Sequence, residues 1–348
     1  MSEMREEMLR TLDRIVEETL TTAARETAEA DGPAHAREAA TAPLWTALEE
    51  AGLLAISGAG GDADVSFADA MALVRRSAYH AVPVPLGEAI AARWLATRAE
   101  LNVPDGGIGM AIVEPGQRTA GGSITVTRRG DAAVLVALAG ANSGEELAIL
   151  APGRALAVQS RNIAGERRES VQVPVPTAGR PIASVRRNAA AGELLAAGAL
   201  LRAVQMAGAM DRALEHSLLW VNDRVQFGRP IARFQAIQHQ LSILASETAA
   251  ASAAVDQAVE ASTAGPDAFA VAVAKARVGE AAGKVANIAH AVFGAMGFTR
   301  EHQLHYTTRR LWAWRNEFGG EAYWQADLGR LAASKGGAGL WELVTARG

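Results

Sequence analysis

The apolar residues are distributed differently in three successive parts of the chain. Up to about residue 103 they recur at helical spacing, and Met8, Leu12 and Ile15 mark one face of the first such helix. In the next part they fall into short runs rich in β-branched side chains, which Gly, Asn and Pro separate. Beyond residue 188 the helical spacing returns and continues nearly to the end of the chain. The pattern predicts two helical regions on either side of a small β region.

The predicted architecture is therefore mainly α with a small central β domain. Its parts are an N-terminal helical domain over residues 1–103, a small β domain over residues 104–188 and a C-terminal helical bundle domain over residues 189–348. In the last part, valines recur every seven residues from Val271 to Val292. Because helices in a bundle need such a seam, we interpret this stripe as bundle core rather than as a ligand contact.

Charge and composition exclude several classes of protein. A formal net charge of -4 gives no reason to expect nucleic acid or an anionic membrane as a partner. The absence of cysteine excludes disulfides, thiolate nucleophiles and cysteine-ligated metal centres. The charged start has no apolar signal-peptide core, and no uninterrupted apolar run reaches the roughly 20 residues that a bilayer span needs. We expect a cytoplasmic protein without a membrane span.

The most informative segment runs from Arg224 to His239, between two long predicted helices. Gly228 and Pro230 favour the end of one helix and the start of the next, because Gly accepts a left-handed cap and Pro suits a first helical turn. Arg224 stands at the end of the first helix and Gln235 early in the second. A guanidinium and an amide brought together at a helix junction form a suitable clamp for a pyrophosphate or a nucleotide.

A second segment, from Phe293 to His305, is followed by Arg309 and Arg310. The two segments resemble the two long signatures of the acyl-CoA dehydrogenases, and the eleven-residue offset between Arg224 and Gln235 is the one that this family shows. The order of helical, β and helical parts is also that of the acyl-CoA dehydrogenase fold, with a four-helix bundle at its C-terminal end.

The resemblance implies a flavoprotein that acts on acyl-CoA. Enzymes of this family take a proton from the α carbon of an acyl-CoA thioester and pass hydride from the β carbon to FAD, and an electron-transfer flavoprotein is the usual acceptor. The matching Arg and Gln of the family hold FAD across a subunit interface, so we expect Arg224 and Gln235 to contact the cofactor. Phe227 either contacts the flavin or packs the hairpin. Gly294 and Gly297 serve either close approach to a phosphate or a tight turn between helices.

Removal of the α proton needs a positioned carboxylate, and neither position that the family uses for it holds an acid here. Matching Phe318 to the aromatic residue of the family's Tyr-Glu-Gly-Thr motif puts Gly319 where the glutamate belongs. The alternative position, on the long helix before the clamp, falls near Gly198. The catalytic residue stays unassigned, with Glu317 and Glu321 as candidates because they flank the gap.

Other parts that would touch the chain's own flavin are depleted as well. Glu114 and Pro115 keep only part of the family's Thr-Glu-Pro loop, and Ala291 stands where the second signature usually presents a Gln. The chain has no tryptophan between Trp94 and Trp220 for the family's Trp-Ile-Thr strand. These losses, with the clamp retained, favour a subunit that completes the FAD site of a related chain, similar to those of the heteromeric steroid side-chain enzymes.

Two alternatives remain open. One is a homo-oligomeric acyl-CoA dehydrogenase that pairs with itself and uses Glu317 or Glu321 as its base. The other is a flavin-free binding or interaction module with the same fold. His302 and His305 have a spacing that can ligate metal on a helix, but no cluster with a third ligand accompanies them, so we expect no metal site.

Overall fold

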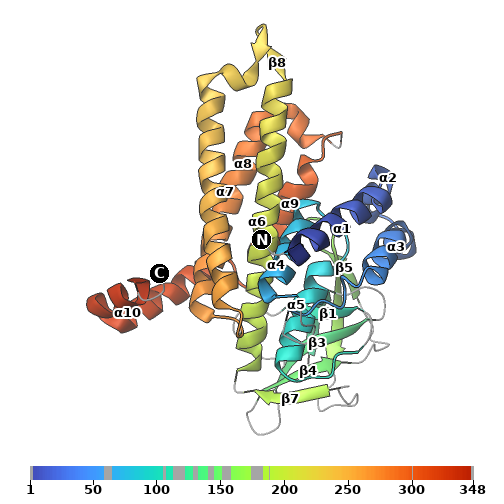
Figure 1. Ribbon diagram of the computed structural model, residues 1–348, viewed down its shortest axis with the longest axis vertical. Coiled ribbons are helices and arrows are strands. Elements are labelled where there is room, and N and C mark those ends of the chain that lie inside the picture. The colour runs from blue at the N-terminus through green and yellow to red at the C-terminus, as the bar shows by residue number, and fades with distance from the viewer. Residues whose placement is uncertain are drawn as a thin grey trace.

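The computed structural model describes residues 3–58, 65–104, 107–112, 122–127, 132–139, 145–150, 158–173, 183–187, 189–299 and 301–345. Helices form its first part, a sheet its middle part and longer helices its last part (Figure 1). The fold class predicted from the sequence, mainly α with a small central sheet, is confirmed. The domain boundaries themselves stay a prediction.

Short and medium helices make up the described N-terminal part. They are α1 (Glu3–Thr19), α2 (Thr22–Glu29), α3 (Ala34–Glu50), α4 (Phe67–Tyr79) and α5 (Leu86–Arg98). The predicted apolar face of α1, with Met8, Leu12 and Ile15, is buried. Ser66 begins α4 with a capping box, because its hydroxyl accepts from the Asp69 N–H while the Asp69 carboxylate accepts from the Ser66 N–H.

The middle part folds into one mixed sheet. Its strands are β1 (Ile108–Ile112), β2 (Gly122–Thr127), β3 (Ala133–Ala139), β4 (Glu145–Leu150), β5 (Val158–Arg161), β6 (Arg167–Val173) and β7 (Ala183–Arg187). Their spatial order is β5-β6-β2-β1-β3-β4-β7, in which β1 and β3 run parallel and the other neighbours antiparallel. Helix α5 packs against β1 and β3. Strands β1 to β4 and β6 coincide with short runs rich in apolar residues, whereas β5 and β7 carry no comparable run.

Long helices and one short hairpin form the last part. They are α6 (Ala190–Asp223), β8 (Val225–Gln226), β9 (Arg229–Pro230), the 3-10 turn η2 (Ile231–Arg233), α7 (Gln235–Ala261), α8 (Ala268–Phe293), the 3-10 turn η3 (Gly294–Phe298), α9 (Leu304–Asn316) and α10 (Glu321–Thr345). Helices α6, α7 and α8 stand side by side, and the predicted valine stripe from Val271 to Val292 is buried between them (Figure 1).

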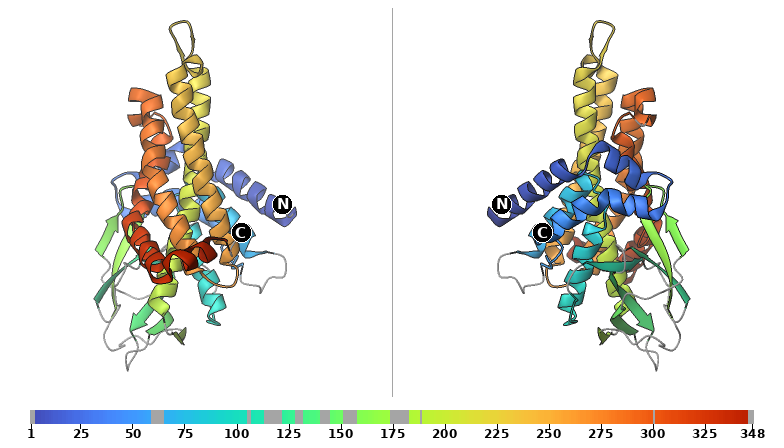
Figure 2. Two further views of the ribbon diagram at one scale, coloured as in Figure 1. Left: turned by 90° about the vertical axis from the view of Figure 1, so that its left-hand side faces the viewer. Right: turned by 90° about the vertical axis from the view of Figure 1, so that its right-hand side faces the viewer.

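Helix α6 is the central element of the molecule. The sheet lies at its lower end, and the β8–β9 hairpin lies at the opposite end, as the two side views show (Figure 2). By length and composition α6 could cross a membrane, but 94% of its apolar window is buried inside the protein. Its apolar surface is therefore used by the sheet and by the helices packed around it.

Gly208 allows α6 to cross α4 closely. A Cβ at this position would lie 2.1 Å from the backbone carbonyl oxygen of Arg75, which cannot move aside without shifting α4. We expect Gly208→Ala to lower the free energy of unfolding by about 2–3 kcal/mol because it overpacks this crossing. Urea unfolding followed by circular dichroism measures the change.

Gly192, near the start of α6, provides the matched control. The nearest atom to a Cβ there would be that of Ala189 at 3.9 Å. Gly192→Ala should therefore raise the free energy of unfolding by about 0.5–1 kcal/mol through helix propensity alone. Equal effects of the two substitutions would contradict the close crossing of α4 and α6.

Candidate functional site

The junction of α6 and α7 is an exposed tip at the far end of the bundle (Figure 1). Arg224 caps the C-terminus of α6, and Gln235 is the first residue of α7. Both residues thus occupy the helix ends that were predicted for them from the sequence. Strands β8 and β9 pair between them, and Phe227 and Gly228 form the turn with φ values of 50° and 76°. Phe227 is 92% exposed and packs little of its ring against the hairpin.

The tip carries positive charge that the described part of the chain does not neutralise. Arg224, Arg229 and Arg233 are exposed, and none of them forms an ion pair within the described residues. The Arg229 guanidinium lies 4.2 Å from the centre of the Phe234 ring, which holds it in place without compensating its charge. Guanidinium groups without an ion pair among the described residues, on the same exposed tip as the Gln235 amide, fit an anionic group such as a pyrophosphate.

The other predicted cofactor residues lie on an element next to the end of α6. Trp220 of α6 stacks on Phe293 at 5.0 Å, and Phe293 directly precedes Gly294. Gly294 ends α8 in the left-handed region with φ 61° and is exposed. Gly297 is buried, and a Cβ there would lie 2.9 Å from the Cβ of Phe293. Packing of the tight turn is thus sufficient to explain Gly297, whereas Gly294 is accessible to a ligand.

The histidines of the second segment serve packing. The His302 ring lies 4.4 Å from that of Phe293 and 5.4 Å from that of His216, so it joins an aromatic cluster at the α6–α8–η3 junction. Within the described ranges, no group of three or more His, Cys, Asp or Glu side chains is placed to hold a metal ion.

A buried ionic cluster lies at the other end of α6, where the N-terminal helices, the sheet and the bundle meet. Glu317, in the turn after α9, accepts from Arg168 Nη2 of β6 at 2.6 Å and from Arg202 Nε of α6 at 2.7 Å. Arg202 is fully buried, and its Nη1 donates to Glu88 of α5 at 2.8 Å. The two carboxylate oxygens of Glu317 are thus both engaged by guanidinium groups.

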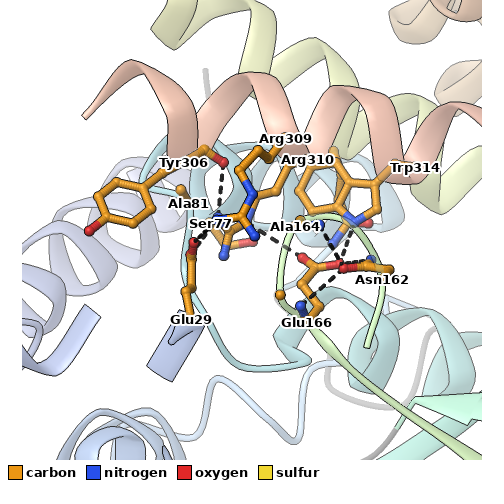
Figure 3. A network of polar contacts seen from close by, with 12 residues as sticks. Glu29, Ser77, Ala81, Asn162, Ala164, Glu166, Tyr306, Arg309, Arg310 and Trp314 are labelled. Carbon is orange, nitrogen blue, oxygen red and sulfur yellow. Dashed lines mark hydrogen bonds and ion pairs between the residues drawn. The ribbon is translucent and has the colours of Figure 1, made fainter. Parts of the chain in front are cut away.

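The same cluster continues through Glu166 to α2 (Figure 3). Glu166 Oε2 accepts from Trp314 Nε1 of α9 at 2.9 Å and from Asn162 Nδ2 at 2.7 Å. Arg310 of α9 lies between two carboxylates, 3.5 Å from Glu166 and 2.7 Å from Glu29 of α2. In Figure 3 the side chains of Arg310 and Trp314 point from α9 toward the β5–β6 turn. One connected set of charges therefore joins all three parts of the fold.

Two small cavities border this cluster. Their volumes are about 70 Å³ and about 60 Å³, and both are lined by Pro83, Val84, Pro85, Glu166 and Arg167. The second also contacts Glu88, Gln205 and Trp314. By volume each holds only a few water molecules. From Gln205 to Arg224 the helix rises roughly 30 Å, at about 1.5 Å per residue, so the tip is remote from these cavities.

The C-terminal part of the chain is similar in sequence to known proteins. Residues 188–321 match the model described as the acyl-CoA dehydrogenase C-terminal domain. The acyl-CoA dehydrogenase IpdE2 of Mycolicibacterium smegmatis is 35% identical over 112 residues, which are 32% of this chain and 35% of that protein. The 3-sulfinopropanoyl-CoA desulfinase of Paraburkholderia xenovorans is 40% identical over 102 residues, which are 29% of this chain and 25% of that protein. The match thus spans about a third or less of these relatives.

Solved structures extend the likeness over nearly the whole chain. The ChsE4-ChsE5 complex from Mycobacterium tuberculosis superposes with a TM-score of 0.76 at 20% identity, over 95% of this chain and 97% of that chain. The Tcur3481-Tcur3483 steroid ACAD variant gives a TM-score of 0.79 at 22% identity, over 95% and 98%. Residues 188–321 thus match the acyl-CoA dehydrogenase C-terminal domain, and the chain as a whole has the fold of these solved structures.

Glu317 is poorly suited to serve as the base of an acyl-CoA dehydrogenase. Burial alone would raise its pKa, but Arg168 and Arg202 outweigh burial and hold the pKa below the usual range. A carboxylate with a lowered pKa and two occupied oxygens is a weak proton acceptor. Glu321, at the start of α10, is paired with Arg315. The geometry argues against both candidates.

The structure also brings together the two positions at which this family carries its base. The Phe318 ring packs directly on Gly198 of α6, and Gly319 follows Phe318 in the turn. Neither Gly198 nor Gly319 carries an acid, as the sequence comparison indicated. Glu114 and Pro115, which keep part of the Thr-Glu-Pro loop, lie outside the described residues.

The residues of the ionic cluster could not be recognised from the sequence alone. Their members are Glu29, Glu88, Glu166, Arg168, Arg202 and Arg310. They are dispersed over the chain, so no local motif unites them. A usable signal is Arg202, which interrupts the apolar run of α6 and is therefore a charge that must be paired inside the protein.

The cluster makes the stability of the fold dependent on pH. In the unfolded chain Glu166 and Glu317 titrate near 4.5, whereas in the folded protein nearby arginines outweigh burial, holding the Glu317 pKa below that value and lowering the Glu166 pKa to about 2. The stabilisation is fully present above the unfolded pKa and is lost as the pH falls through the folded pKa. We expect the free energy of unfolding, measured with urea, to decrease from about pH 5 to about pH 2.

Glu317→Gln tests the origin of this dependence. At pH 7 the free energy of unfolding of the variant should be about 3–5 kcal/mol lower than that of the wild type, because Arg168 and Arg202 lose their shared counterion. Between pH 5 and pH 2 its free energy of unfolding should also change less steeply with pH. Glu280→Gln is the control, because its ion pairs on α8 are exposed and should contribute less than about 1 kcal/mol. If the free energy of unfolding of Glu317→Gln fell as steeply between pH 5 and pH 2 as that of the wild type, Glu317 would not be a source of the pH dependence.

Proposed function

We propose that this chain is the subunit of a hetero-oligomeric acyl-CoA dehydrogenase that completes the FAD site of a related partner chain. The observation that carries the proposal is the position of Arg224 and Gln235 on an exposed tip, roughly 30 Å along α6 from the two cavities that border the ionic cluster. A clamp at that distance cannot hold a cofactor in those cavities, so it serves a site to which another chain contributes.

The chemistry of the tip fits FAD. The pyrophosphate of FAD is doubly charged, and Arg224 with Arg229 and Arg233 offers guanidinium donors that no carboxylate of the described residues competes for. Gln235 adds a neutral amide donor, and Phe227 adds an exposed ring against which a partner or a nucleotide can pack. When bound, FAD supplies the hydride acceptor for α,β-desaturation of an acyl-CoA thioester.

The partner supplies the base and the acyl pocket in this proposal. The ionic cluster of this chain holds Glu317 ionised between two arginines, and the cavities beside it, of about 70 Å³ and about 60 Å³, are too small for an acyl chain. The ChsE4-ChsE5 complex and the Tcur3481-Tcur3483 steroid ACAD, which superpose on this chain, are each named for two proteins, which supports a hetero-oligomer. We propose an electron-transfer flavoprotein as the electron acceptor and the cytoplasm as the location.

Removal of the clamp tests the proposal. In a complex formed by co-expressing this chain with a related acyl-CoA dehydrogenase chain, Arg224→Ala should weaken FAD binding about 10- to 100-fold, because a charge-assisted hydrogen bond contributes about 1.5–3 kcal/mol. Gln235→Ala should weaken it less. Flavin absorbance per complex and acyl-CoA desaturation measure the two effects.

Arg330→Ala is the matched control, since Arg330 is exposed on α10 and paired with Asp327. It should leave both flavin content and activity unchanged. Full flavin in the Arg224→Ala complex would contradict the proposal. Loss of desaturation in Glu317→Gln or Glu321→Gln with flavin retained would favour the homo-oligomeric enzyme, and a flavin-free complex would favour the interaction module.

A further inference from the structure

Glu29, the last residue of α2, lies in a wall that two cavities share. On the outer side, a cavity of about 350 Å³ lies between α2 and α9, and its walls include the exposed residues Glu26 and Thr27. On the inner side lies the cavity of about 70 Å³ beside the ionic cluster. Glu29 lines both cavities, whereas Arg309 lines the outer one and Arg310 the inner one.

The inner cavity continues toward the interior of the protein. It shares a second wall with the cavity of about 60 Å³, which also contacts Gln205 and Trp314. That wall consists of Pro83, Val84, Pro85, Glu166 and Arg167. Three cavities thus follow one another from the surface beside α2 to the centre of α6, and Glu29 stands at the first partition.

The Glu29 carboxylate has two arginine neighbours on α9. Its Oε1 lies 2.7 Å from Arg310 Nη1, and its Oε2 lies 3.9 Å from Arg309 Nη1. Arg310 is fully buried, whereas the Arg309 side chain is 39% exposed and is held by its Nε, which donates to the Ile163 carbonyl at 2.8 Å. In Figure 3 the Glu29 carboxylate points toward the Arg310 guanidinium.

The contact between Glu29 and Arg310 is incompletely satisfied. Glu29 is buried, yet neither of its carboxylate oxygens accepts a well-aligned hydrogen bond within the described part of the chain. Nε and Nη2 of Arg310 likewise have no such partner there. Because charge-assisted hydrogen bonds supply much of the strength of a buried ion pair, this pair is easier to separate than a fully bonded one.

Helix α2 itself is held mainly by polar contacts. Glu29 is its one buried residue. Arg25 Nη1 donates to the Ala81 carbonyl at 2.7 Å, and Arg161 Nη1 donates to the Ala30 carbonyl at 2.6 Å. A segment with few buried apolar contacts opens locally at low cost in free energy. A small displacement of the last turn of α2 therefore requires little apolar surface to be exposed.

We propose that Glu29 is a gate that alternates between the two arginines. Paired with Arg310, it closes the passage between the outer and inner cavities. Paired with Arg309, it opens this passage to water and small polar solutes. The carboxylate keeps a guanidinium partner in both positions, and Arg310 retains Glu166 at 3.5 Å when Glu29 leaves. Because Glu166 lines both inner cavities, the open gate gives solutes access to the ionic cluster.

A single introduced thiol tests the gate, since the chain has no cysteine of its own. Thr41 lines the inner cavity and is 4% exposed, so the reaction rate of Thr41→Cys with methyl methanethiosulfonate reports access to that cavity. In this background Glu29→Gln keeps the size of the side chain but removes its charge. The thiol should then react at least about tenfold faster, because the pair that closes the passage is lost.

Arg309→Met should change the rate in the opposite direction. It removes the charge that stabilises the open position and keeps an unbranched side chain in the wall of the outer cavity. Thr41→Cys should therefore react about two- to fivefold more slowly, the range expected for loss of a partly exposed ion pair. A pair with a purely structural role would give faster or unchanged reaction in both variants.

Ser217→Cys is the matched control, because Ser217 is fully buried on α6 and lines none of the three cavities. Its thiol should react at the same slow rate in all three backgrounds. The gate would be overturned by an unchanged rate for Thr41→Cys in Glu29→Gln, or by an equal acceleration of Ser217→Cys, which would indicate general loosening.

Arg309→Met decides alone if circular dichroism shows that Glu29→Gln does not fold. Slower reaction of Thr41→Cys in Arg309→Met supports the gate, and equal or faster reaction overturns it. None of these readouts involves flavin or a partner chain, so failure of the gate is distinct from failure of the Arg224 clamp.

Discussion

The structure depends on buried charges that must be paired. Arg202 and Arg310 are fully buried, and each bridges carboxylates from elements that are distant in sequence. Taking a charge out of water costs several kcal/mol, and loss of one partner leaves the other uncompensated. Most other arrangements of the N-terminal helices, the sheet and the bundle would therefore leave a buried charge without a counterion. The cluster acts through this specificity, since apolar packing supplies most of the net stabilisation.

Helix α6 separates two environments along one rigid element. Its first part is buried beside the sheet and carries Arg202 into the cluster, whereas its end is exposed and carries Arg224 at the tip. The arginine in the core is neutralised by the chain's own carboxylates, whereas the arginine at the tip has no ion pair with any carboxylate among the described residues. The same residue type thus stabilises the fold at one end and is available to a partner at the other. The helix fixes the distance between the ionic cluster at Arg202 and the exposed tip at Arg224.

Much of the fold could be predicted from the sequence, because it depends on local patterns. The heptad valines of α8 are buried as the seven-residue repeat predicts. Gly228 and Pro230 mark the junction as expected, but they lie in the β8–β9 hairpin, because Arg224 already caps α6 and α7 begins only at Gln235. The ionic cluster could not be predicted, since its members are brought together only by tertiary packing. Glu317 illustrates the limit: it flanks the family's base position in sequence, yet its neighbours Arg168 and Arg202 lower its pKa.

The visible absorption spectrum of this chain purified alone, scaled to flavin per chain, tests the central claim most directly. If the chain contributes only the outer clamp of a partner's FAD site, the folded chain is colourless by itself and acquires flavin with a related partner chain. Flavin bound near one per chain in the absence of any other protein would contradict this account, because it would mean that the chain completes an FAD site by itself or with its own copies.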